Sequence, residues 1–177
     1  MTSTVSTALD VEPAALRNTT RYSWDPSVAP VTVSRATWAA GDADVSEPVG
    51  FREEMGDLYD PSLVEYGDYG LESGAQAMTR LLERSPDIDA VFAASDLMAS
   101  GAIGVLRRAG LRVPDDIAVA GFDDSGLAAT HEPPITTMRQ PWDQISAEMV
   151  SLLLDVIDGG PRRAITLPTE LVVRASA

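Results

Sequence analysis

The chain has 177 residues, of which 13 are basic and 27 acidic, so its formal net charge is −14. Hydrophobic residues make up 45% and charged residues 23%, as in ordinary globular proteins, which excludes a wholly disordered chain. The absence of Cys and the single His exclude disulfide frameworks, thiolate zinc sites and His-rich metal clusters.

The charge balance and the lack of long apolar runs limit the partners of the chain. A strongly acidic protein is poorly suited to holding a nucleic-acid backbone through a broad basic face. No apolar run reaches the ~18 residues that a membrane span needs, and no secretory signal is visible at the N-terminus. We therefore expect no membrane partner and a cytoplasmic location.

The first 35 residues differ in composition from the rest of the chain. Ser and Thr crowd positions 2–7, and Pro13, Pro26 and Pro30 interrupt any long helix. A short helix over residues 11–17 is the one element expected here. We predict that residues 1–35 are a weakly structured segment and that residues 36–177 form the folded unit.

From residue 36 onward, short apolar runs alternate with amphipathic stretches that carry a helical period. Gly110 stands where a helix-ending glycine belongs. Strands alternating with helices are typical of βαβ units, so we expect an α/β fold with a parallel sheet flanked by helices. The expected strands are 36–40, 62–66, 88–93 and 117–122, and the expected helices are 49–58, 72–84 and 96–109.

The pattern changes after residue 124. An extended connection over residues 132–137 leads to the strongest predicted helix, 142–157, and two closing strands, 164–167 and 170–174, flank Pro168. The helix has one apolar stripe, made by Ile145, Met149, Leu152, Leu153 and Val156.

Polar side chains follow three of the predicted strands. Asp123 and Asp124 come after the strand 117–122, Ser95 and Asp96 follow 88–93, and Tyr69 follows 62–66. Ligands of open α/β sheets bind outside the carboxyl ends of the strands, where a carboxylate accepts hydrogen bonds from hydroxyls and an aromatic ring stacks on a sugar. A capped turn explains the two aspartates equally well, and helix capping explains Asp96.

No set of residues completes a catalytic mechanism. The chain has no glycine-rich phosphate loop and no Gly-x-Ser-x-Gly turn, and His131 has no second His or Cys to act with. The pair Asp42 and Asp44 lacks the glycine and distal Glu of a calcium loop. We therefore expect a ligand-binding protein rather than an enzyme, without a cofactor or a metal.

Several segments together resemble one protein family. The sequences PDIDAVFAASDLMA (86–99), GLRVPDDIAVAGFDD (110–124) and PPITTMRQP (133–141) are similar to the C-terminal half of the sensor domain of LacI/GalR-type transcriptional repressors. The ending LPTELVVR (167–174) resembles the end of that domain. The resemblance covers residues 36–177 and implies one lobe of a periplasmic-binding-protein-like sensor.

The resemblance also implies a function and a set of site residues. In this family two lobes close on a small effector, often a sugar, and their rotation repositions a DNA-binding headpiece. Asp123 matches the ligand-binding aspartate, Ser95 matches a position that is usually Asn, and Tyr69 matches an aromatic under the ligand. Asp96 is the fourth candidate ligand contact, and Thr137 and Gln140 belong to the crossover between lobes.

Three features depart from the family pattern. Glu47 stands where the family usually has an Arg that donates to ligand hydroxyls. Residues 28–36 resemble the recognition helix of the headpiece, but its partner helix is not recognisable. Since 35 residues are too few for a headpiece and a first lobe, we expect a truncated regulator that contacts DNA only if a headpiece is supplied elsewhere.

The helix 142–158 then lacks its usual partner surface and favours pairing with another chain, such as a second copy.

Two alternatives remain. The chain could be a solute-binding protein of a sugar transport system, or a partner of intact homologues that does not bind DNA and pairs through the helix 142–158.

Overall fold

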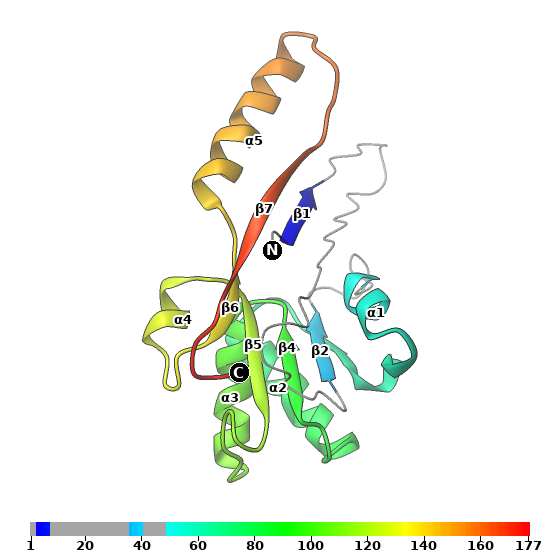
Figure 1. The fold of residues 1–177 in the computed structure, drawn as a ribbon, viewed down its shortest axis with the longest axis vertical. Coiled ribbons are helices and arrows are strands. Elements are labelled where there is room, and N and C mark those ends of the chain that lie inside the picture. Colours follow the sequence, from blue (N-terminus) through cyan, green and yellow to red (C-terminus); the bar gives the residue numbers. More distant parts are fainter. Residues whose placement is uncertain (1–2, 8–35, 41–48) are drawn as a thin grey trace.

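The computed structural model describes residues 3–7, 36–40 and 49–177, and within these ranges the strands form one sheet in the order β1-β7-β6-β5-β4-β2-β3 (Figure 1). The parallel part, from β2 to β6, confirms the predicted α/β architecture. β7 is antiparallel to β6, and β1 is antiparallel to β7. The strands are β1 (Ser3–Thr7), β2 (Ala36–Ala40), β3 (Val64–Tyr66), β4 (Ala90–Ala93), β5 (Ala118–Asp123), β6 (Thr136–Arg139) and β7 (Ile165–Val172).

The helices follow the predicted positions closely, with one addition. They are α1 (Val49–Met55), α2 (Leu71–Arg84), α3 (Asp96–Arg108), α4 (Gly126–Thr130) and α5 (Trp142–Ile157), and short 3-10 turns occupy Gly56–Leu58 and Pro61–Leu63. At the start of α3 the Ser95 hydroxyl accepts a hydrogen bond from the Met98 backbone N–H. Gly110, with φ of 80°, follows the end of α3 as predicted.

Close packing of α2 against α3 builds the core of the lobe. A Cβ on Gly74 would lie 2.3 Å from the Met98 backbone oxygen, and one on Gly101 would lie 2.0 Å from the Leu71 backbone oxygen. The two helices therefore approach backbone to backbone at these glycines. Around this contact the buried side chains include Met78, Leu81, Met98, Ile103, Leu106, Val119 and Ile135.

The C-terminal part differs from the prediction in three respects. A single strand, β7, replaces the two closing strands expected around Pro168. Pro168 lies beyond the residues that pair with β6, so its missing N–H leaves that ladder intact. Part of the expected extended connection is the strand β6, and the short helix α4 was not expected.

The N-terminal segment contains a strand that the sequence did not predict. β1 pairs with β7 over Ser3–Thr7, because a strand edge of β7 is available there. Several predicted features lie outside the described residues: the helix at 11–17, residues 28–35 of the headpiece-like segment, the Asp42 and Asp44 pair, and Glu47.

α5 stands apart from the α2–α3 lobe, joined to it by β6 and β7 (Figure 1). The helix has the predicted bounds, and none of its residues is buried. Its apolar surface is wider than one stripe, since Val150, Leu154 and Ile157 are exposed as well, Ile157 to 69%. Among the described residues, α5 therefore leaves a broad apolar surface exposed.

Candidate functional site

The predicted site residues follow the carboxyl ends of three parallel strands. Tyr69 follows β3, Ser95 follows β4 and Asp123 ends β5. Parallel pairing through β2 places these strand ends at the same edge of the sheet. This edge is where open α/β sheets bind ligands.

Asp123 has an unusual backbone and a partly occupied carboxylate. Its φ of 106° lies in a region that side-chain-bearing residues rarely adopt. The Gln140 Nε2 donates to Asp123 Oδ1 at 2.7 Å, whereas no described residue donates to Oδ2. Burial raises the pKa of Asp123, the hydrogen bond from Gln140 lowers it, and the charge of Asp96 raises it, with a net upward shift. Among the described residues, Oδ2 of Asp123 is thus free to accept a hydrogen bond.

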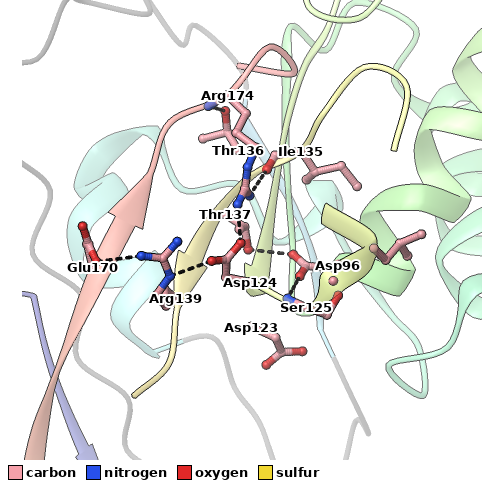
Figure 2. Close-up of polar contacts among 12 residues, drawn as sticks. Asp96, Asp123, Asp124, Ser125, Ile135, Thr136, Thr137, Arg139, Glu170 and Arg174 are labelled. Atoms are coloured by element: carbon pink, nitrogen blue, oxygen red, sulfur yellow. Dashed lines mark hydrogen bonds and ion pairs between the residues drawn. The ribbon is translucent and has the colours of Figure 1, made fainter. Parts of the chain in front are cut away.

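Asp96 is buried and ties three segments together. Its side chain is 1% exposed. The Thr137 hydroxyl donates to Oδ1 and the Ser125 backbone N–H donates to Oδ2, both at 2.6 Å (Figure 2). Gly121 makes room for this carboxylate, because a Cβ there would lie 2.6 Å from Oδ1. Asp96 therefore links the start of α3 to β6 and to the segment after β5, and each of its oxygens accepts one hydrogen bond from within the chain. Its role as a ligand contact stays a prediction.

Ser95 and Tyr69 are linked to each other. The buried Ser95 hydroxyl donates to the Tyr69 carbonyl at 2.8 Å while it caps α3. Tyr69 has a φ of 65° and a half-exposed side chain. Its loop is held by Asp68, whose Oδ1 accepts from the Gly70 N–H at 2.9 Å. The hydroxyl of Ser95 thus fixes the loop that presents the Tyr69 ring.

Thr137 and Gln140, predicted to belong to the crossover, both contact the site aspartates. Thr137 is fully buried in β6 and donates to Asp96, and Gln140 follows β6 and donates to Asp123. The segment that leads to α5 is therefore hydrogen-bonded at two points, Asp96 and Asp123, to the sheet edge where the predicted site lies, which we call the ligand edge.

Two functional features were missed at the sequence level. Trp142, the first residue of α5, has a half-exposed side chain whose Nε1 donates to the Asp123 carbonyl at 3.3 Å. Asp124 accepts from Arg139 and Arg174, which lie far along the chain (Figure 2). At the sequence level Trp142 was only the first residue of the predicted helix 142–157, and no local signal pairs Asp124 with either Arg.

Two further findings concern other chemistries. Within the described ranges, no group of three or more acidic or His side chains is placed to hold a metal ion. No helix in the same ranges is long and apolar enough to cross a membrane.

Comparison with known sequences places this fold in a family. The model of the periplasmic binding protein-like domain matches residues 48–177. The HTH-type transcriptional regulator CelR of Thermobifida fusca is 48% identical over 139 residues, which are 76% of this chain and 41% of that protein. The HTH-type transcriptional repressor CytR of Escherichia coli K12 is 39% identical over 126 residues, which are 68% of this chain and 36% of that protein.

Solved structures agree with the sequence comparison. The transcriptional regulator CelR–cellobiose complex has a TM-score of 0.77 and 46% identity, and the match covers 82% of this chain and 47% of that one. A lac repressor dimer bound to operator and the anti-inducer ONPF has a TM-score of 0.72 and 27% identity, with 82% and 53% covered. The chain spans less than half the length of these curated relatives. It belongs to the periplasmic-binding-protein-like family, in the form that serves LacI-type transcriptional regulators as their sensor domain.

Proposed function

We propose that this chain senses a small polyhydroxylated effector, a sugar of the cellobiose class, and controls transcription as part of a LacI-type regulator. The observation that carries the proposal is the placement of Asp123, a left-handed residue at the carboxyl end of β5 whose Oδ2 accepts no hydrogen bond from the described residues. The likeness to the regulator solved with cellobiose supports the choice of ligand class.

The residues at this edge suit a sugar. An ionised carboxylate accepts hydrogen bonds from hydroxyls, and these charge-assisted bonds are stronger than neutral ones. The half-exposed rings of Tyr69 and Trp142 offer apolar faces to the C–H surface of a sugar ring. Asp123 would thus orient the sugar through its hydroxyls, and the rings of Tyr69 and Trp142 would bury its apolar surface.

The proposal extends to partners and location. A second lobe would close over the effector, and a DNA-binding headpiece and a second subunit would complete a cytoplasmic regulator. The exposed apolar surface of α5 supports a partner surface in the complete protein. Since the curated relatives are transcriptional regulators, neither a transport protein nor an enzyme is proposed.

Calorimetric titration of the chain with cellobiose, maltose and ribose tests this function. We expect cellobiose to bind and Asp123→Asn to weaken it about 10-fold to 100-fold, the value of a hydrogen bond to a charged group. Asp115→Asn is the matched control, because Asp115 lies in the exposed turn before β5.

The outcomes distinguish a failure of the proposed function from a failure of the role proposed for Asp123. Failure of all three sugars to bind at millimolar concentration would contradict the proposed function. Equal cellobiose affinity in the wild type and in Asp123→Asn would leave the function standing and remove Asp123 from the site.

A further inference from the structure

We propose that Asp124 is a positioning residue, whose ion pairs hold Asp123 in its left-handed conformation and fix the base of α5 to the ligand edge. The inference deepens the proposed function and rests on it for the role of Asp123. Its test uses no ligand, so its failure is distinct from a failure of that function.

The carboxylate of Asp124 is fully engaged by two guanidinium groups. The Arg174 Nη2 donates to Oδ1 at 2.5 Å, and the Arg139 Nε donates to Oδ2 at 2.6 Å (Figure 2). The Asp124 side chain is 9% exposed and that of Arg174 is 16% exposed. The Asp124–Arg174 pair is shielded from solvent and is screened less than a surface ion pair, whereas the Arg139 side chain is 48% exposed.

The two arginines lie on the segments that connect α5 to the lobe. Arg139 ends β6, shortly before α5 begins, and Arg174 follows β7, which returns from α5. Arg174 also donates to the Ile135 carbonyl at 2.8 Å, just before β6. One carboxylate therefore joins the end of β5 to both connecting segments.

The backbone at this point needs such support. Asp123 and Asp124 have φ values of 106° and 54°, two successive left-handed residues that are not glycine. Such conformations persist only where the surroundings impose them. Asp124 is held through its side chain, and the next residue, Ser125, is held because its N–H donates to Asp96. With Asp123 paired to Arg139 in the β5–β6 ladder, the left-handed pair is fixed on both sides.

The same contacts determine how α5 leaves the lobe. α5 has no buried residue, so its orientation depends on the strands at its base. The Trp142 indole N–H donates to the Asp123 carbonyl, so a shift of the Asp123 backbone moves the partner of the first α5 residue. The Trp142 ring is consequently a local reporter of the Asp123–Asp124 backbone.

The experiment is NMR of the full chain in two labelled forms. In fluorotryptophan-labelled protein, Trp142→Phe identifies the Trp142 fluorine resonance. In isotope-labelled protein, the backbone carbon shifts of Asp123 are sensitive to its backbone conformation. Asp124→Asn keeps the side-chain shape and removes the charge. The control is Glu170→Gln, which changes the other carboxylate partner of Arg139; the Glu170 side chain is 70% exposed.

We expect Asp124→Asn to move the Trp142 resonance and the Asp123 carbon shifts, whereas Glu170→Gln leaves both in place. If Asp124→Asn fails to fold, Arg139→Gln removes the more exposed half of the pairing and should give smaller shifts in the same direction. A folded variant with lower stability but unchanged Trp142 and Asp123 signals would reduce Asp124 to a stabilising ion pair and overturn the proposal.

Discussion

Asp123 and Asp124 are neighbours in sequence but lie in opposite electrostatic surroundings. Burial raises the pKa of Asp123, and the charge of Asp96 adds to that effect beyond what Gln140 offsets. Burial also acts to raise the pKa of Asp124, but the hydrogen bonds and charges of Arg174 and Arg139 lower it below its ordinary value. Ionisation is thus disfavoured at Asp123 and favoured at Asp124.

This contrast predicts opposite effects of two Asn substitutions on stability. A lowered folded pKa means that Asp124 stabilises the fold above the unfolded Asp pKa of about 3.9, and that this stability is lost as pH falls through the folded pKa. Asp124→Asn should therefore lower the free energy of unfolding at pH 7 by about 1–3 kcal/mol, after allowance for the half-exposed Arg139. Urea unfolding from neutral to acid pH should show this deficit shrinking below about pH 4.

Asp123→Asn supplies the contrast in the same measurement. Because the folded pKa of Asp123 is raised, its ionised form costs stability at neutral pH, and the cost is relieved as pH falls. The neutral Asn should therefore leave the unfolding free energy at pH 7 unchanged or higher. A loss equal to that of Asp124→Asn would show that the two environments do not differ as described.

Single residues show how far the sequence alone could go. Asp123, Ser95 and Tyr69 were predicted to share an edge, because strand ends and turn residues are visible locally. The engagement of Asp96 by Thr137 spans 41 positions, and that of Asp124 by Arg174 spans 50. Such pairs depend on strand order, which no local pattern determines.

At the level of elements, the contact between α2 and α3 makes a sharp prediction about three glycines. Gly74→Ala and Gly101→Ala place a Cβ within 2.3 Å and 2.0 Å of backbone atoms, so each should destabilise the fold by about 1–3 kcal/mol. Gly104 lies in α3 with its nearest such neighbour, Arg108 Nη1, at 3.5 Å. Gly104→Ala should stabilise the chain by about 0.5–1 kcal/mol, since Gly is a poor helix former.

Thermal unfolding of the three variants decides this point. Lowered midpoints for Gly74→Ala and Gly101→Ala with a raised midpoint for Gly104→Ala are expected. If all three variants rose together, helix propensity alone would govern these positions and the close approach would be refuted.

Helices whose bounds depend on nearby residues were predicted well, whereas strands that depend on pairing with a distant strand were not. The bounds of α2, α3 and α5 agree with the prediction to within a residue, because apolar period and caps lie within each helix. β7 was divided at Pro168 because the sequence does not show that β6 pairs only with its later residues. β1 was missed because its pairing depends on β7, more than 150 positions away.

At the scale of the whole molecule, the structure divides into a packed lobe and an exposed arm. The lobe buries α3 and much of α2 against the sheet, whereas α5 leaves apolar side chains exposed on several sides. A helix that is apolar over much of its circumference is typical of a buried position. The closing second lobe that we propose would cover this surface in the complete regulator.

The division predicts that replacing exposed Leu residues of α5 costs much less stability than truncating a buried Leu of the lobe. Leu153 and Leu154 in α5 are 60% and 55% exposed, so Leu153→Gln with Leu154→Gln should change the unfolding free energy by only about 0.5 kcal/mol per site. Leu81 in α2 is 0% exposed, and Leu81→Ala should cost about 2–5 kcal/mol. Urea unfolding measures both, and binding of an apolar dye should fall in the α5 double variant because the exposed patch is reduced. A loss of stability in the α5 variant comparable to that of Leu81→Ala would mean that the arm is packed against the chain in solution.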